Sequence, residues 1–548
     1  MSDSIRYRAD IDGLRAIAVL GVIVYHARLG VLSGGYTGVD IFFVISGYLI
    51  SSIILREHAH GTFSIARFYE RRIRRIFPAL MMVIATTAVV GWFILSPYDY
   101  QVFGQSALAA SAFFSNFFFN RFTDYFAPAS ETHPLLHTWS LGVEEQFYLL
   151  APFALLLIMR LRRPYKSIVV MGLLVLSLAI SMYGIEYEWP SAFYLLPSRA
   201  FEILIGVAVA LRIYPVMHTQ VTRTLVGLAG LAAIAIAMLT YRPETPFPGV
   251  AALLPCLGTA ALIASGERRD TPTCELLSFG PLVLIGTISY SLYLWHWPVL
   301  SMAHYAIPED PDLLLRFLLL ALSVILATLS WAFIEVPMRE GVIGVHANKV
   351  FAGALASIVL CWAGSAMLDT THGATGRLSP ERLALLKSIP NAIDQTNVCP
   401  LHDAAEKAHC HIGSKTAQPS FVLFGDSHAL AIAGEVARDA QEMGKSGYLV
   451  FAHGCPPMFA LEAFDARKFR MCVDAGNTLA RVLEEPNIRT ILVVGRWAVW
   501  SEGARMPNET RNPLRMFAEG DHELNRKIFS LLLQASVETW TRNDRRVV

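Results

Sequence analysis

The stretch "GLRAIAVLGVIVYHARLG" (residues 13–30) has the length and apolar character of a membrane-spanning helix, yet Arg15 and His26 lie within it. Eleven positions separate them. At about 100° per residue they fall on one face of a helix, roughly 16 Å apart along its axis. Because an ionisable side chain at that depth is costly, it should face a bundle interior or a wet cavity. The stretch therefore predicts a polytopic helical membrane domain with a buried polar site.

The composition supports a membrane protein. Hydrophobic residues make up 54% of the 548 residues, charged residues only 16%, and the mean hydropathy is +0.45. The net charge of +1 provides no field that would attract nucleic acid, so we expect no nucleic-acid partner. Apolar runs of about 20 residues, enough to cross a bilayer, predict about eleven spans: 11–31, 39–56, 78–96, 140–159, 167–185, 193–211, 224–241, 249–266, 281–303, 313–334 and 350–368.

The positions of basic residues predict the orientation, because cytoplasmic links are enriched in lysine and arginine. The link between spans two and three reads "REHAHGTFSIARFYERRIRRIFP" (56–78), and later links also carry basic clusters. All of them fall on one side if 103–120 lies on or dips into the membrane without crossing it. We therefore expect a multi-pass protein of the bacterial inner membrane, with a cytoplasmic N-terminus, an uncleaved first span and a periplasmic C-terminal domain.

The chain changes character after Leu368. We expect a membrane domain at 1–340, an additional transmembrane helix at 341–369, a periplasmic connecting extension at 370–420 and an α/β domain at 421–548. Four cysteines in an oxidising compartment indicate two disulfides. Three pairings are possible, and we favour the close one, 399–410 with 455–472.

Ionisable side chains in and beside the predicted spans are candidates for acid–base catalysis and for anion binding. His26 could act as a general base, or less readily as a transient acyl carrier, while Arg15 contacts an anionic group. The alternative is a packing histidine and an interfacial arginine. The loop "RFYERRIRRIFP" (67–78) could bind phosphate groups, which suit guanidinium forks, or could serve only as a topology signal or a contact to lipid headgroups. Its candidate donor-binding residues are Arg71, Arg72, Arg74 and Arg75.

The segment "HPLLHTWSLGVEEQFYLLAP" (133–152) brings Trp139, Glu144 and Glu145 to the start of a span. Acidic residues at such a position commonly pair with a base or an arginine. We expect Glu144 to orient His26 or to hold its protonation state. The alternative is a partly solvated charge at the interface.

The outer half contains "PSFVLFGDSHALAIAGEVARDAQ" (419–441). It predicts a buried strand at 421–424, a turn at Gly425 and a helix at 429–440. Ser427 would then be a nucleophile exposed at a strand-to-helix corner, where N–H groups can stabilise an oxyanion. Asp426 is a further candidate, although Asp-Ser could simply be an N-cap.

The rest of this half fits a doubly wound sheet. We expect strands at 447–452, 489–494 and 545–548 and helices at 475–485 and 522–541, with Gly454 as a candidate oxyanion donor.

Six segments in order resemble the acyltransferase family 3 integral membrane proteins: "DGLRAIAVLGVIVYH", "GGYTGVDIFFVISGYLI", "RFYERRIRRIFP", "HTWSLGVEEQFYLLAP", "ISYSLYLWHWP" and "FIEVPMR". The resemblance implies transfer of an acyl group, usually acetyl, from a cytoplasmic acyl-CoA to an extracytoplasmic carbohydrate. It implies that Arg15 and His26 match the family's R-x10-H pair, that the arginine pairs match its R-x-x-R element, and that Trp139 and Glu144 match W-S-L-x-x-E. Asp40, in the second segment, is a further candidate.

The "GDSH" block resembles the opening motif of SGNH hydrolases, and the two-domain arrangement resembles O-antigen and related surface-polysaccharide acetylases. An SGNH site uses a histidine base in a D-x-x-H block. No such spacing follows Ser427, since neither His453 nor His522 has an aspartate three positions earlier. We expect the domain to be incomplete at its C-terminus, with the base beyond residue 548.

The sequence thus predicts a membrane O-acyltransferase that uses acetyl-CoA as donor co-substrate and no metal. The expected acceptor is a glycan or lipid-linked glycan, with lipopolysaccharide O-antigen first and peptidoglycan or another exported glycan as the alternative. Ser427 either takes up the acyl group as an ester, or its domain only positions the sugar. A polysaccharide or lipid-sugar transporter and a membrane-anchored esterase are the competing interpretations.

Overall fold

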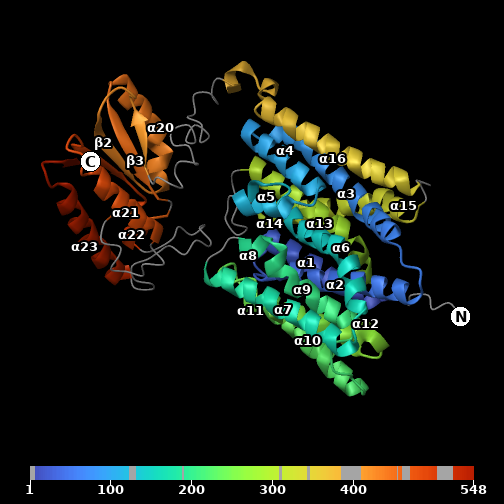
Figure 1. Cartoon of the computed structure of the whole chain (residues 1–548). Coiled ribbons are helices and arrows are strands. Elements are labelled where there is room, and N and C mark those ends of the chain that lie inside the picture. Colours follow the sequence, from blue (N-terminus) through green and yellow to red (C-terminus); the bar gives the residue numbers. More distant parts are fainter. Residues whose placement is uncertain are drawn as a thin grey trace. The chain divides into compact units, whose positions relative to one another are not determined.

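The computed structural model describes residues 7–122, 131–187, 191–307, 311–341, 346–383, 409–452, 454–458, 470–502 and 522–548. The chain divides into two compact units, Met1–Thr375 and Gly376–Val548. Helices build the first unit, and a sheet with helices builds the second (Figure 1).

The first unit follows the apolar periodicity of the sequence. Its helices are α1 (Ala9–His26), α2 (Gly38–Ala59), α3 (Ile65–Ile94), α4 (Pro97–Ser111), α5 (Ser115–Phe122), α6 (Thr138–Met159), α7 (Arg163–Glu186), α8 (Ser191–Tyr194), α9 (Leu196–Ala210), α10 (Gln220–Thr240), α11 (Gly249–Ser265), α12 (Pro272–Leu277), α13 (Gly280–Ala306), α14 (Leu313–Ser330), α15 (Val336–Arg339) and α16 (Ala347–Thr370).

Nine helical stretches in the described part of the chain are long and apolar enough to cross a membrane. Helices α1 and α13 coincide with the two remaining predicted spans but are not among the nine. A membrane protein is therefore supported, while the number of spans and their orientation stay predictions.

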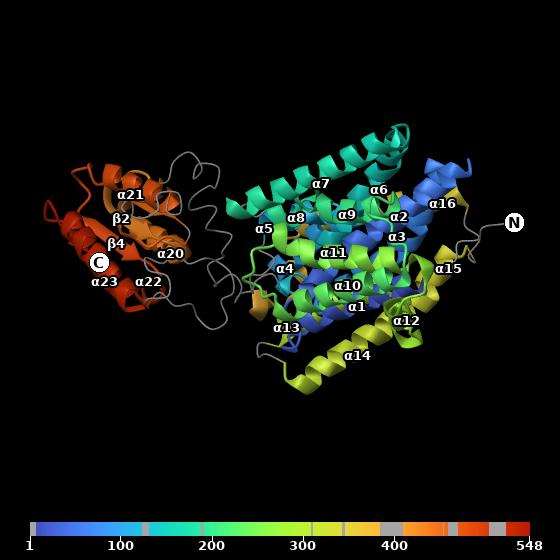
Figure 2. The same ribbon diagram turned by 90° about the horizontal axis from the view of Figure 1, so that it is seen from below.

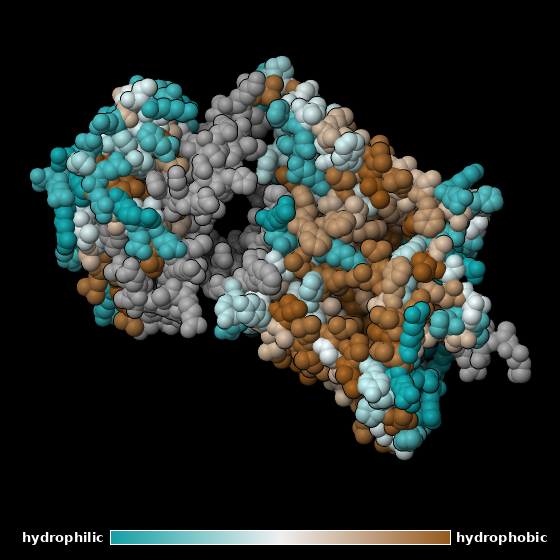
Figure 3. Space-filling view, in the orientation of Figure 1, coloured by the Kyte–Doolittle hydropathy of each residue, from teal (hydrophilic) through white to brown (hydrophobic). Residues whose placement is uncertain are grey.

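Helices at the centre of this unit pack against other helices, whereas those at its edge expose apolar side chains. Helix α1 packs along α13, and α2 packs along α9. Helices α7 and α14 run along opposite flanks (Figure 2), and α16 lies against α3 and α4. Outer side chains such as Leu360, which is 73% exposed, leave a broad apolar surface that is brown in Figure 3. A surface of this kind is typical of a bundle surrounded by lipid.

Two local expectations differ from the structure. The segment 67–78 is not a loop: it lies in the first turns of α3, whose N-cap Ser64 accepts a hydrogen bond from the backbone N–H of Arg67. Helix α1 ends at His26, so this residue closes the helix instead of lying well inside it. The segment 103–120, expected to lie on or dip into the membrane, is divided between α4 and α5 by a turn that includes Phe113, whose φ is +58°. Its place relative to a membrane stays a prediction.

The second unit contains a five-stranded sheet in the order β1-β3-β2-β4-β5. Its strands are β1 (His409–Gly413), β2 (Pro419–Gly425), β3 (Ser446–Phe451), β4 (Thr490–Val494) and β5 (Arg546–Val547). Strands β2 to β5 are parallel, and β1 pairs with β3 antiparallel. The four predicted strands are confirmed. Strand β1 was not predicted, and it comes from the segment expected to be a connector.

Helices and disulfides complete this unit. The helices are α20 (Ser427–Glu442), α21 (Arg470–Val482), α22 (Trp497–Glu502) and α23 (His522–Trp540). The predicted Cys455–Cys472 disulfide is confirmed. Cys410 is also in a disulfide, while its predicted partner Cys399 lies outside the described residues.

Candidate active site

A deep cavity of about 240 Å³ lies between α1, α2, α3, α6 and α13. Arg15 reaches it from α1, Arg72 and Arg75 from α3, and Glu144 from α6. Apolar side chains make up most of the remaining wall. Three guanidinium groups around one apolar cavity can hold an anionic ligand by charge and its hydrocarbon part by packing.

The helical conformation of the 67–78 segment decides which arginines face this cavity. Arg72 and Arg75 line the cavity. Arg71 and Arg74 are not part of its lining and form ion pairs at 2.8 Å with Glu57 and Glu70. The structure brings two of the four predicted donor-binding arginines into the site.

A wider basin of about 1390 Å³ adjoins the cavity and shares Arg15 and Arg75 with it. Acidic residues in its wall are few, namely Asp12, Glu267 and Asp270. The remaining arginines in its wall are Arg8, Arg56, Arg163, Arg212, Arg223, Arg268, Arg269 and Arg339. A basin with this charge attracts anions such as phosphate groups and raises their local concentration.

The two carboxylates of α6 have different surroundings. Glu144 lines the cavity and accepts hydrogen bonds from Ser46 at 3.0 Å and Tyr148 at 3.1 Å. In Glu145, Oε1 is buried and has no hydrogen-bond partner among the described residues, and the same holds for Nε of Arg72. Such atoms are costly unless a ligand or water satisfies them. Glu145 is not among the lining residues, whereas Arg72 is, so its Nε is placed to meet a polar ligand in the cavity.

His26 lies elsewhere. Its Nδ1 is 3.0 Å from Nε2 of His296 on α13, and its ring meets the edge of Trp297. It lines a second, smaller cavity of about 50 Å³ together with Arg28 and Glu131, which form an ion pair at 2.6 Å.

The structure corrects two expectations about this base. Glu144 lies in the arginine-lined cavity and not at His26, where the polar neighbour is His296. The two cavities are also separate. Tyr293 lines the arginine-lined cavity, bonds Ser140 at 2.7 Å, and places its ring 5.4 Å from that of His296. Two side chains of α13, Tyr293 and His296, thus separate His26 from the arginine-lined cavity.

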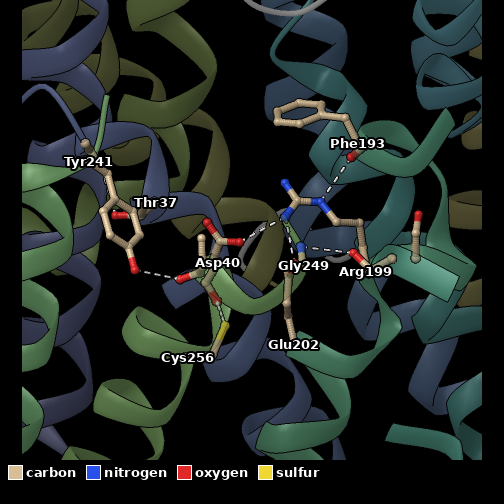
Figure 4. A network of polar contacts seen from close by, with 12 residues as sticks. Thr37, Asp40, Phe193, Arg199, Glu202, Tyr241, Gly249 and Cys256 are labelled. Atoms are coloured by element: carbon tan, nitrogen blue, oxygen red, sulfur yellow. Dashed lines mark hydrogen bonds and ion pairs between the residues drawn. The ribbon is translucent and has the colours of Figure 1, made fainter. Parts of the chain in front are cut away.

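Asp40 belongs to a buried ion network around Arg199 (Figure 4), and Trp139 packs against the same guanidinium. The guanidinium bonds Asp40 at 3.0 Å and Glu202 at 2.6 Å, and all three side chains are at most 1% exposed. The Trp139 ring lies 5.3 Å from the Arg199 guanidinium carbon. This network joins α2 to α9. Asp40 is therefore placed in an interhelical ion pair and not in the donor cavity.

Ser427 is the first residue of α20 and is exposed at the end of β2, as predicted. Asp426 is the N-cap: its carboxylate accepts from the His428 backbone N–H and from the Arg496 backbone N–H, both at 2.8 Å. It also lies 3.0 Å from Nδ1 of His428. The cap holds the corner rigid and ties it to the end of β4.

The other parts of a serine site are only partly described. Gly454 follows β3 with φ +61° and is exposed. It shares with Ser427 the edge of the sheet where the parallel strands end, which is the usual ligand edge of such sheets. His453 and the side chain of His522 lie outside the described residues. The described part of the chain contains no group of ligands that could hold a metal.

Comparison of the sequence with known protein families identifies both parts of the chain. A family profile described as an acyltransferase domain matches residues 8–334, more than half of the chain. The chain belongs to the acyltransferase family. An SGNH domain described as fused to such domains matches residues 398–548. The combination of a membrane acyltransferase domain with a C-terminal SGNH domain is thereby confirmed.

The relatives of this acyltransferase-family chain include proteins of Staphylococcus aureus. One, from strain MSSA476, has the provisional name O-acetyltransferase SAS0844 and is 34% identical over 352 residues. Another, the O-acetyltransferase OatA of strain NCTC 8325 / PS 47, is 30% identical over 351 residues. Each alignment covers 61% of this chain, and the chain spans only 58% of the relative's length. No solved structure was found to match.

Three residues of this acyltransferase-family protein escaped the sequence analysis. His296 lies in "ISYSLYLWHWP", a histidine inside an apolar helix, which is the same signal that identified His26. Arg199 lies three positions before Glu202 in an apolar run, a spacing that predicts an ion pair. His428 directly follows Ser427, and the D-x-x-H spacing of SGNH sites does not point to an adjacent histidine.

Proposed function

We propose that this protein is a membrane O-acetyltransferase that moves an acetyl group from cytoplasmic acetyl-CoA to a hydroxyl of an extracytoplasmic glycan. One observation carries the proposal: an arginine-lined basin adjoins a cavity lined by Arg15, Arg72 and Arg75, and the side chains of Tyr293 and His296 connect that cavity to His26. The basin suits the phosphates of coenzyme A, and the cavity suits its thioester arm.

In the proposed reaction His26 is the general base. The acceptor oxygen bonds to the acetyl carbonyl carbon while its proton passes to His26. The carbon–sulfur bond then breaks, and the departing thiolate takes up that proton, so that coenzyme A leaves as the thiol. The acetyl group has to pass Tyr293, whose ring stands between the cavity and His296. Arg15, Arg72 and Arg75 bind the donor and do not react.

The SGNH domain provides the second part of the proposal. Exposed Ser427 at the start of α20 can take up the acetyl group as an ester and deliver it to a sugar hydroxyl. In the alternative, the membrane domain acetylates the sugar directly and the SGNH domain only positions it. A Ser427→Ala protein separates these routes, because it still acetylates the glycan only in the second.

The cellular location, the orientation in the membrane and the acceptor glycan are also part of the proposal. We place the protein in the bacterial inner membrane with its N-terminus in the cytoplasm and its SGNH domain in the periplasm. Lipopolysaccharide O-antigen is the first candidate acceptor, and peptidoglycan or another exported glycan is the second. We retain 341–369 as an additional span and the region up to 420 as a connecting extension that includes β1.

The decisive experiment uses the full chain in lipid vesicles with radiolabelled acetyl-CoA, together with mass spectrometry of the surface glycan from producing cells. We expect coenzyme A release and added O-acetyl groups, both abolished in His26→Ala. Glycan movement across the membrane without acetyl-CoA turnover would instead identify a transporter. Loss of glycan acetyl groups on production of the protein would identify an esterase.

A further inference from the structure

Three imidazole rings meet between the two cavities. His26 ends α1, His137 precedes α6, and His296 lies in α13. His296 is fully buried and places its ring parallel to that of His26, with the centroids 5.3 Å apart. The His137 ring stands across that of His296 at 5.8 Å. Within this group a hydrogen bond joins His26 to His296.

The hydrogen bonds determine which nitrogen carries each proton. Nδ1 of His296 lies 3.2 Å from the backbone oxygen of Leu292, and a carbonyl oxygen can only accept. This nitrogen therefore carries the proton, which leaves Nε2 of His296 as an acceptor, since a neutral ring has one of each. Nε2 faces Nδ1 of His26 at 3.0 Å. Nδ1 of His26 is accordingly the donor, and its Nε2 is the atom with the lone pair.

We propose that His296 is the positioning residue of this enzyme: it fixes the tautomer of His26 so that Nε2 is the base. The inference rests on the proposed function, because it names the residue through which His26 acts. When Nε2 takes the acceptor's proton, Nδ1–H stays bonded to His296, and this bond becomes charge-assisted and stronger. A base held in one tautomer by a second group is the general arrangement for proton-abstracting histidines.

The first test measures the tautomer itself and needs no activity. Solid-state NMR of the full chain in lipid vesicles, labelled with ¹⁵N-histidine, is compared with the His26→Gln protein to assign the ring. We expect His26 to be protonated at Nδ1 and unprotonated at Nε2, and His296→Leu to lose this preference. A proton on Nε2 of His26 in the native protein would overturn the proposal.

The second test is kinetic and compares two replacements. The Gln amide oxygen of His296→Gln can still accept from Nδ1 of His26, whereas His296→Leu offers no acceptor. We expect kcat to fall on the order of 100-fold in the Leu protein and by less than about tenfold in the Gln protein, with the KM for acetyl-CoA unchanged in both. The control His346→Gln changes an exposed histidine at the start of α16.

The outcomes separate this inference from the proposed function. Equal losses in the Gln and Leu proteins would show that His296 only fills space, and full activity of the Leu protein would show that it does not position His26. If the native protein turns over no acetyl-CoA, the proposed function fails. The NMR result then still decides whether His296 sets the tautomer of His26.

Discussion

Arg72 and Arg75 differ from Arg71 and Arg74 only in the direction in which α3 turns them. The first pair lines the cavity, and the second pair forms ion pairs with Glu57 and Glu70. An arginine already paired with a nearby carboxylate has less to gain from a phosphate than one that faces an apolar cavity. Residues with the same motif position therefore have different roles.

Replacing one arginine from each pair tests this difference. Arg72→Gln should raise the KM for acetyl-CoA by at least about tenfold, because a hydrogen bond between charged groups contributes about 1.5–3 kcal/mol. Arg74→Gln, the matched control, should change it by less than about threefold, as expected for a partly exposed ion pair. Steady-state kinetics of both proteins in vesicles provides the values. Equal effects would contradict the assignment of Arg72, and not Arg74, to the cavity.

The Arg199 network predicts a stability effect. Arg199→Leu leaves the buried carboxylates of Asp40 and Glu202 without their cation, and breaking such a network costs about 3–5 kcal/mol. Thermal unfolding of detergent-solubilised protein should show a large loss for Arg199→Leu. A triple replacement with apolar residues at all three positions should recover much of it. An unchanged midpoint in Arg199→Leu would show that the network adds no stability.

At the scale of elements, helices α2 and α9 pack closely because each has a glycine where it contacts the other. A Cβ on Gly47 would lie 2.0 Å from the backbone oxygen of Ile203, and one on Gly206 would lie 2.0 Å from that of Val44. Both clashes are with backbone, which cannot rotate away. This contact also holds Asp40 of α2 beside Arg199 of α9, so the small residues and the ion network depend on one another.

Gly206→Ala should therefore destabilise the helical unit by about 1–3 kcal/mol, the usual cost of overpacking. Gly172→Ala on α7 is the control, since nothing lies within 4 Å of the added atom. Thermal unfolding monitored by circular dichroism compares the two proteins. Equal midpoints would mean that α2 and α9 can move apart without cost.

At the scale of the whole molecule, each unit has its own core. The main hydrophobic cluster of the helical unit contains residues from 11 to 374, and the sheet is packed by separate clusters. The Cys455–Cys472 disulfide closes a loop of 17 residues within the second unit. Its contribution to stability should therefore be confined to that unit.

The double replacement Cys455→Ser and Cys472→Ser should destabilise the SGNH unit by about 3 kcal/mol, the amount expected for a loop of this length. Differential scanning calorimetry of the full chain should show a lower transition temperature for this unit and an unchanged transition for the helices. A shift of both transitions by the same amount would show that the units unfold together.

The sequence by itself determined the helices, the strands and the helix cap that joins β2 to α20. Apolar runs, strand alternation and the Asp426–Ser427 cap depend on neighbours within a few positions, so their periods and caps are visible in the chain. Four strands and the cluster of arginines were predictable on that basis, whereas the 455–472 disulfide was only the favoured one of three possible pairings.

Only the tertiary structure decided which polar groups meet. His26 and His296 are 270 positions apart, and Asp40 and Arg199 are 159 apart. Such pairs depend on the rotation and crossing of whole helices, which side-chain packing sets and no local period encodes. For the same reason Glu144 lies in the cavity lined by Arg15, Arg72 and Arg75, and His26 lies beside His296. Strand β1 likewise joins the sheet by antiparallel pairing with β3, although its segment has no strand signal of its own.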